Sequence, residues 1–272
     1  MNRLLLKRLF YIFLALLFVP SLFASESYAQ TSPVDIDVIQ PKTIEINYSF
    51  SGGKVSVREV IPSGNKVALR LIGPKEDLVL MRKDRVKGLW MNVEQIHFHD
   101  IPNVYLLMTS KDLSSVENRD SIKAMKLDYF SLLAESLPDK SLNKDPEKHQ
   151  TDNSLLINEL IKLKESDKLY QISDGTVNIK PLEKGAWDQV DAVLNVPAKI
   201  SPGTYTLELF ALKDGKSRLV RSSSIEVKLT GLPAMISNLA FKNGLLYGIL
   251  AVIIATFSGL LIGVVFGSKG SH

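Results

Sequence analysis

The chain has 272 residues, of which 45% are hydrophobic, and its formal net charge is +4. Because it contains no cysteine, it cannot form disulfides, bind a metal through thiolates or use a cysteine nucleophile. The nearly balanced charge excludes an obvious polyanionic partner such as nucleic acid, and a chain of this length can bury its own core without covalent cross-links.

The N-terminal segment has the pattern of a secretory signal peptide. Three basic residues precede an apolar run at residues 9–19, and the small-residue pattern Ser27-Tyr28-Ala29 follows. We predict cleavage after Ala29, so that residues 1–29 are removed and the mature chain keeps 30 basic and 28 acidic residues, a net charge of +2. The alternative is an uncleaved anchor, but about eleven apolar residues are short for a span of about twenty.

Residues 30–110 predict a β-rich exported domain. In "KTIEINYSF" the residues Ile44, Ile46, Tyr48 and Phe50 alternate with polar positions, as in a half-buried strand. Further extended segments, including "KVSVREVI", "KVALRLI", "DLVLM", "LWMNVE", "QIHFHD" and "NVYLLMTS", alternate with Gly, Pro, Asn and Ser turns. This spacing is typical of a β-sandwich, and we predict an immunoglobulin-like one.

The pattern becomes helical between residues 111 and 168. Apolar residues recur at helical spacing within residues 116–137 and again within residues 154–164, which predicts a two-helix insertion. In the second helix the apolar face is predicted to comprise Leu156, Ile157, Leu160, Ile161 and Leu163. The polar stretch "PDKSLNKDPEKHQ" between them predicts an exposed linker that carries a solvated His149.

Residues 169–232 return to strand character as a second β-rich segment. The residues Lys213-Asp214-Gly215-Lys216 predict a hairpin turn. In "PAKISPGTYTLEL" a Pro-Gly corner precedes Tyr205, whose hydroxyl could bond back across the corner, or whose ring could simply be buried. The sequence leaves open whether the two β-rich segments form one domain or two.

The C-terminal segment at residues 244–267 has no charged residue and is long enough to cross a bilayer as a helix. With a cleaved signal peptide, this span places the body outside the cytoplasmic membrane and residues 268–272 inside as a stub. Small residues recur every fourth position, at Ala251, Ala255, Gly259 and Gly263, which indicates a face for close packing with another helix. Self-association and docking to a polytopic membrane protein both fit this stripe.

One short motif raises the question of a metal site. His97 and His99 are two residues apart and precede Asp100, so in a strand both imidazoles would share a face. Two imidazoles and a carboxylate could begin a zinc or copper site. If Phe98 lies in the core, however, alternation places both histidines on the solvated face, which argues against a metal site.

The basic stretch at residues 82–87 raises a second question. Arg82, Lys83 and Arg85 around a predicted turn could bind an anion or a partner, or could form an ordinary soluble hairpin tip. Trp90 could be a core aromatic or an interface anchor. The sequence has no nucleophile elbow, zincin motif, Walker loop or dinucleotide fingerprint, so we expect neither an enzyme nor a cofactor.

Four stretches carry a family resemblance: "INYSFSGGKVSV", "LIGPKEDLVLMRKDRVKGLWMN", "VPAKISPGTYTLELFALKDG" and "LLYGILAVIIATFSGLLIGVVF". The chain resembles a family of putative transmembrane proteins first catalogued from alphaproteobacteria, which have a signal peptide, an exported domain and one C-terminal span. The resemblance centres on residues 82–92, including Trp90 and Asn92, and does not include the histidines. It carries no activity, but it implies a link with permeases of the sulfite-exporter type.

These observations predict a single-span protein of the bacterial cytoplasmic membrane with a periplasmic body. We expect an accessory or interaction protein of a membrane complex, and we expect the partner or anion contact at Arg82, Lys83, Arg85, Trp90 and Asn92. A periplasmic module that binds a ligand, or a metal through His97, His99 and Asp100, is the alternative. An anchored enzyme is the third candidate.

Overall fold

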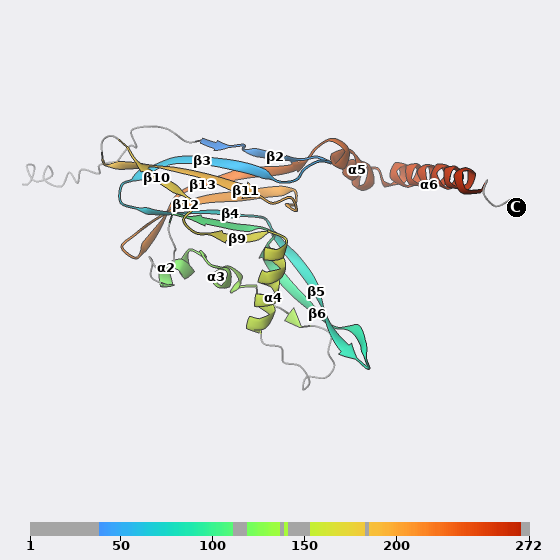
Figure 1. Cartoon of the computed structure of the whole chain (residues 1–272), viewed down its shortest axis with the longest axis horizontal. Coiled ribbons are helices and arrows are strands. Elements are labelled where there is room, and N and C mark those ends of the chain that lie inside the picture. Colours follow the sequence, from blue (N-terminus) through green and yellow to red (C-terminus); the bar gives the residue numbers. More distant parts are fainter. Residues whose placement is uncertain (1–37, 111–118, 137–138, 141–152, 183–184, 268–272) are drawn as a thin grey trace, which may run out of the picture. The chain divides into compact units, whose positions relative to one another are not determined.

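The computed structural model describes residues 38–110, 119–136, 139–140, 153–182 and 185–267. The predicted signal peptide, His149 with most of its polar linker, and the C-terminal stub lie outside these residues. Within the described part, strands form three sheets (Figure 1). The fold is mainly β with one long C-terminal helix, as the sequence predicts.

Two of the sheets form the sandwich. The four-stranded sheet has the order β1 (Val38–Gln40), β3 (Gly53–Pro62), β11 (Trp187–Val196), β10 (Asn178–Pro181). The six-stranded sheet has the order β2 (Thr43–Ile46), β13 (Lys216–Leu229), β12 (Gly203–Lys213), β4 (Lys66–Ile72), β7 (Tyr105–Thr109), β9 (Tyr170–Ser173). Strands from both β-rich segments pair in each sheet, β3 with β11 and β4 with β12, so the two segments build one sandwich.

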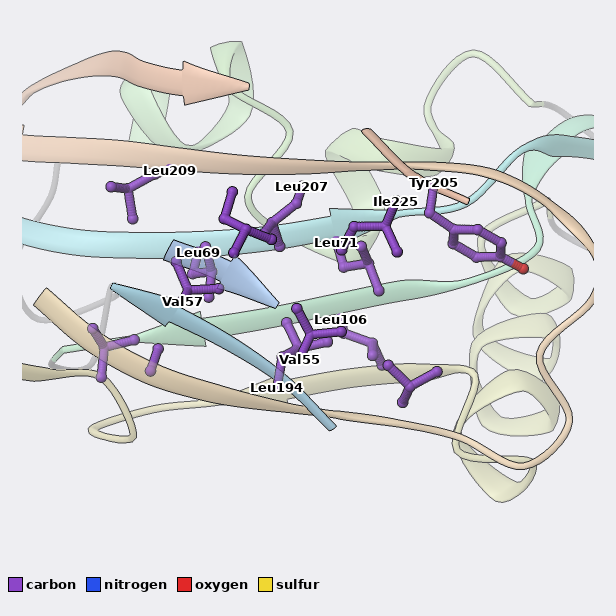
Figure 2. Packing of buried hydrophobic residues seen from close by; sticks show 14 of the residues in the cluster. Val55, Val57, Leu69, Leu71, Leu106, Leu194, Tyr205, Leu207, Leu209 and Ile225 are labelled. Carbon is purple, nitrogen blue, oxygen red and sulfur yellow. The ribbon is translucent and has the colours of Figure 1, made fainter. Parts of the chain in front are cut away.

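The first core lies between these two sheets. Alternate residues of β3 and β11 pack against alternate residues of β4, β12 and β13, as Figure 2 shows for Val55, Leu69, Leu194, Leu207 and Ile225. Each of these side chains is at most 2% exposed, and complete burial of an aliphatic side chain contributes about 1.5–3 kcal/mol. This core explains the period of two in the sequence of these strands.

A second core covers the other face of the six-stranded sheet. Tyr105, Leu107, Tyr170 and Phe210 project from that face and pack against helices and against the base of a hairpin. The helices are α2 (Arg119–Ala124), α3 (Tyr129–Leu133) and α4 (Asn153–Ser166). Because β4 is covered on both faces, residues 67–71 are all buried and the strand reads as a continuous run rather than an alternation.

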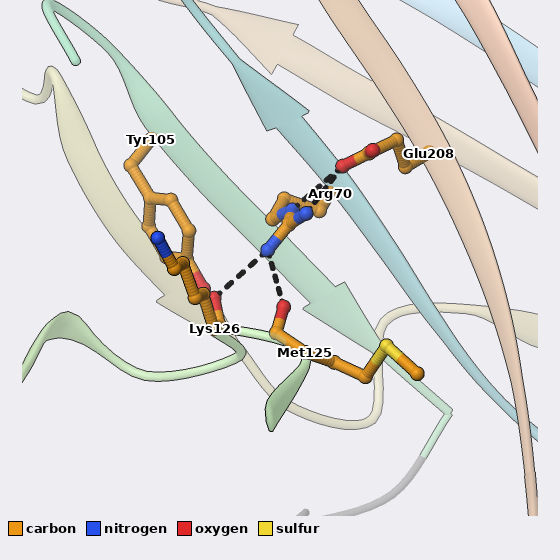
Figure 3. Close-up of polar contacts among 5 residues, drawn as sticks. All are labelled: Arg70, Tyr105, Met125, Lys126 and Glu208. Carbon is orange, nitrogen blue, oxygen red and sulfur yellow. Dashed lines mark hydrogen bonds and ion pairs between the residues drawn. The ribbon is translucent and has the colours of Figure 1, made fainter. Parts of the chain in front are cut away.

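The predicted single helix at residues 116–137 is wrong, because the described part of this segment is broken into α2 and α3. Lys126 has a φ of 53°, and Asp128 caps α3 by accepting a hydrogen bond from the Ser131 N–H. Two backbone carbonyls at this break, those of Met125 and Lys126, accept hydrogen bonds from the Arg70 guanidinium (Figure 3). A buried arginine on β4 therefore binds the segment just after α2, at the break that local periodicity did not predict.

Helix α4 confirms the second predicted helix, with one exchange on its buried face. Leu156, Leu160 and Ile161 are buried as predicted, but Leu163 is exposed and Lys164 is buried instead. The Lys164 ammonium lies 2.6 Å from the Glu76 carboxylate, which compensates the buried charge. Position 164 continues the buried row of positions 156, 157, 160 and 161 at helical spacing, and the ion pair allows a lysine to occupy it.

Two predicted turns are confirmed in detail. The β12–β13 hairpin turns at Asp214 and Gly215, both with positive φ, which is the geometry of a two-residue type I′ turn. The buried Tyr205 hydroxyl donates a hydrogen bond to the Ser201 carbonyl at 2.8 Å, so the bond across the corner is present. The same hydroxyl accepts from the Asn103 amide at 3.0 Å and so ties the corner to the loop before β7.

The chain leaves the sandwich through two further helices, α5 (Gly231–Lys242) and α6 (Gly244–Gly267). Helix α6 matches the predicted span residue for residue and is, among the described residues, the one helix long and apolar enough to cross a membrane. Helix α5 was not predicted from the sequence, where no element was assigned to residues 233–243 and the β-rich segment was expected to continue to residue 232.

Candidate functional site

The third sheet contains the candidate site. Strands β5 (Lys75–Val86) and β6 (Leu89–Pro102) form one long hairpin, and the short β8 (Asp139–Lys140) pairs with β6 (Figure 1). The prediction of two separate strands within β6 is wrong, because residues 89–102 are continuous. The turn residues Lys87 and Gly88 have φ of 50° and 90°, so a type I′ turn joins two strands of matching twist.

The base of this hairpin is part of the second core. Leu78 and Leu80 lie opposite Phe98 and Ile96 on the face that packs against the helical layer. Above this face, Arg82 lies opposite Glu94 and pairs with it at 2.8 Å. The strands continue for about five residues beyond this pair, roughly 17 Å, without entering either core.

We call residues 81–92 the hairpin tip. Its large apolar side chains face solvent: Trp90 is 73% exposed, Leu89 69%, Met81 51% and Met91 50%. Four basic residues, at positions 82, 83, 85 and 87, accompany a single acidic one, Asp84. A soluble domain rarely displays aromatic, methionine and leucine side chains together in this way unless they contact something.

The strand register shows which predicted contact residues lie together. Lys83 is opposite Asn92 and Arg85 is opposite Trp90, so these four side chains share one face of the hairpin. Arg82 lies on the other face, where it pairs with Glu94 and also with Asp84 at 3.5 Å. We therefore assign Arg82 a structural role within the hairpin. We call the other face, with Lys83, Arg85, Trp90 and Asn92, the candidate contact face.

The root of the hairpin is held by buried polar contacts. The Lys164 ammonium of α4 reaches the Glu76 carboxylate and lies over the Tyr170 ring, 5.8 Å from its centroid. The Tyr170 hydroxyl donates to the Pro102 carbonyl at 2.8 Å, and burial followed by the nearby Glu76 carboxylate raises the pKa of this phenol. Both strands of the hairpin are therefore anchored where they leave the sandwich.

The histidine motif lies at an irregularity of the same hairpin. The register shifts at Asp77, which faces both His99 and Asp100, and Asp100 has a φ of 55°. The Asp77 carboxylate accepts from the Asp100 N–H at 3.2 Å and lies 3.3 Å from the His99 Nδ1. The predicted burial of Phe98 is confirmed, and the motif is explained by a β-bulge that Asp77 stabilises.

The two imidazoles share a face, and their centroids are 6.3 Å apart. Across the described residues, no three His, Cys, Asp or Glu side chains gather in a way that could hold a metal ion. The described residues therefore provide no support for a metal site at His97, His99 and Asp100.

A second feature, which sequence reasoning missed, is a groove of about 590 Å³ at one edge of the sandwich. Strand β10 pairs only with residues 188–191 of β11, so within the described part no strand covers the following residues of β11 on that side. The polar lining comprises Ser56, Arg58, Gln171, Ser173, Thr176, Asn178, Asp191 and Asn195. Arg58 and Asp191 form an ion pair of 2.7 Å across two neighbouring strands there.

The small-residue stripe lies along α6. Ala251, Ala255, Gly259 and Gly263 follow one another at four-residue spacing on a continuous helix. Around Gly259 and Gly263 a Cβ atom would meet nothing within 4 Å, so this face is open in the single chain. A second helix could approach it closely.

The fold defines a class: a membrane protein with a mainly β body, one C-terminal span and an exposed hairpin. The family model described as "Putative transmembrane protein (Alph_Pro_TM)" matches residues 36–268, and the chain belongs to this family. No curated protein and no solved structure matches the chain.

Proposed function

We propose that this chain is a membrane-anchored accessory protein that contacts a membrane partner through the tip of its β5–β6 hairpin. The observation that carries the proposal is the exposure of Trp90 beside Lys83 and Arg85 on one face, and of Leu89 and Met91 on the other face, of a hairpin whose base is fixed in the core. Aromatic, methionine and arginine side chains are enriched at protein interfaces, where one buried tryptophan often dominates affinity. The proposed role is not enzymatic.

The proposed location is the periplasmic side of the bacterial cytoplasmic membrane. A signal peptide at residues 1–29 would export the body, and α6 would then stop in the membrane with its C-terminal end in the cytoplasm. The family resemblance favours a permease of the sulfite-exporter type as the partner. The basic contact face would then meet an acidic surface of that permease.

The test is a charge reversal on the contact face. Lys83→Glu with Arg85→Glu should reduce co-purification of membrane proteins from gently solubilised membranes by about tenfold or more, corresponding to about 1.4 kcal/mol or more of lost binding. The matched control is Lys216→Glu with Arg218→Glu, which makes the same charge change beside the type I′ turn of the β12–β13 hairpin. Equal co-purification by both variants would contradict the proposal.

The span offers a second route to association, with itself or with a partner. Gly259→Ile with Gly263→Ile keeps α6 apolar but places branched side chains on the open face, so crosslinking between spans should be lost while insertion survives. Leu260→Ile with Val264→Ile is the control on neighbouring faces. If the glycine variant crosslinks like the wild type, α6 acts only as an anchor.

A ligand-binding module is the second candidate function, and the edge groove supports it. Its volume of about 590 Å³ falls within the range of pockets that hold small molecules, and its walls carry hydroxyl, amide and charged groups. Native mass spectrometry of the full chain should then detect a bound molecule that is lost in Ser56→Trp. A wild-type chain that carries no such molecule would remove this candidate.

A further inference from the structure

Helix α5 exposes an apolar face that the sandwich does not cover. Leu232, Met235, Ile236 and Leu239 are spaced by three and four residues and so lie on one side of the helix. None of the helix residues is buried, and Met235 is 62% exposed and Ile236 52%. An amphipathic helix normally buries such a face, so this one requires a surface outside the described residues.

The position of α5 in the chain identifies that surface. The helix ends at Lys242, and only Asn243 separates it from the span, which begins at Gly244. Twelve helical residues cover about 18 Å, so the whole apolar face lies within that distance of the point where the chain enters the bilayer. The lipid surface is thus continuous with the membrane contact already assigned to α6.

The junction is built as a break rather than as one long helix. Asn243 has φ −134° and ψ 54°, outside the helical region, so α6 does not simply extend α5. The Asn243 N–H donates to the Leu239 carbonyl, and the Asn243 carbonyl accepts from the Tyr247 N–H. Asn243 is therefore hydrogen-bonded to both helices, and the chain changes direction there.

Charge and neighbouring aromatics agree with a lipid surface. The helix contains no acidic residue, and its single basic residue is Lys242. The Thr230 N–H, just before the helix, donates to the Ile46 carbonyl at 2.8 Å, which fixes the start of α5 to the end of β2. Two residues beyond Ile46, Tyr48 is 81% exposed, and tyrosine is a side chain that favours the membrane interface.

We propose that α5 is a membrane-surface helix whose face of Leu232, Met235, Ile236 and Leu239 inserts among the lipids of the leaflet that α6 enters. The helix lies in the plane of the interface, with Ser237 and Asn238 facing away from the lipid. Phe241, which is 88% exposed, lies on the same side as these two residues in the last turn before the span. It sets the distance between the sandwich and the bilayer, because Thr230 ties its start to β2. This role is independent of the hairpin tip and of any protein partner.

The natural absence of cysteine permits a direct test. Full-length single-cysteine variants Met235→Cys, Ile236→Cys, Ser237→Cys and Asn238→Cys are labelled with an environment-sensitive fluorophore and reconstituted into vesicles of phosphatidylethanolamine and phosphatidylglycerol. Quenching is then compared between a spin-labelled lipid, with the label near the headgroup, and aqueous iodide. Labels at positions 235 and 236 should lose most of their fluorescence to the lipid quencher, and labels at 237 and 238 to iodide.

Each other outcome overturns the inference. Iodide quenching at all four positions would show a helix in solution, and lipid quenching at all four would make α5 part of the span. Protection of positions 235 and 236 from both quenchers would show that protein, such as a second copy of the chain, covers the face. Because the vesicles contain no other protein, failure here is distinct from failure of the proposed partner contact.

Discussion

Replacing Glu208 by methionine should destabilise the fold strongly, because it leaves a buried guanidinium without its counter-ion. Arg70 and Glu208 lie on neighbouring strands, and their side chains are 11% and 17% exposed. Arg70 also donates to the carbonyls of Met125 and Lys126, so the same charge joins the six-stranded sheet to the helical layer (Figure 3).

Removing one partner of a buried ion pair typically costs about 3–5 kcal/mol. The lower end applies here, because in Glu208→Met the guanidinium keeps its two carbonyl acceptors and its position over the Phe210 ring, 5.0 Å from the centroid. A loss of about 3 kcal/mol lowers the unfolding temperature of a domain of this size by about 6–12 °C. Thermal unfolding of the full chain in detergent, followed by circular dichroism, measures the change.

The matched control is an exposed ion pair in the same domain. Arg58 and Asp191 are 52% and 24% exposed, so Asp191→Asn should cost only about 0–1 kcal/mol. If Glu208→Met costs no more than Asp191→Asn, the buried pair does not hold the helical layer to the sheet and the reasoning is refuted.

Three further predictions concern the corner, the buried phenols and the histidines. Tyr205→Phe removes the bond to the Ser201 carbonyl and should lower the free energy of unfolding by about 1–2 kcal/mol in urea titration; no change would show that packing alone holds the corner. Burial raises the pKa of Tyr170, so the stability that the neutral phenol contributes is full below about pH 10 and falls as the pH rises further, which unfolding temperatures at about pH 9 to pH 11 will measure. A constant unfolding temperature over that range would contradict the prediction that the neutral Tyr170 phenol contributes to stability. His97→Ala with His99→Ala should change stability by less than about 0.5 kcal/mol, and calorimetry should find only weak zinc binding; stoichiometric binding tighter than about 1 μM that this variant abolishes would restore the metal reading.

Local patterns in the sequence correctly predicted the elements whose structure is determined by residues close together in the chain. The β12–β13 turn follows from Asp214 and Gly215, which tolerate positive φ, and the span follows from an uninterrupted apolar run. The Tyr205 corner was anticipated from a Pro-Gly pair before a strand that opens with an aromatic residue. In each case the residues that decide the structure lie within a few positions of one another.

The features that were not predicted from the sequence involve contacts between residues far apart in the chain. Arg70, 55 residues before Met125, binds a carbonyl at the break between α2 and α3, and Glu76, 88 residues from Lys164, compensates the buried charge of that lysine. The groove results from the shortness of β10 beside β11, which no local pattern records. The sequence predicted that Lys83, Arg85, Trp90 and Asn92 belong to one contact, together with Arg82. Only the strand register shows that the first four share one face and that Arg82 lies on the other.

The central claim is that the hairpin tip contacts a membrane partner, and photo-crosslinking in cells tests it most directly. A photoreactive amino acid replaces Trp90 in the full chain, and a control chain carries it at Leu219, an exposed apolar residue of β13 that is 44% exposed. The account predicts a discrete adduct with a membrane protein from position 90 and none from position 219. No adduct from position 90, or the same adducts from both positions, would contradict the account.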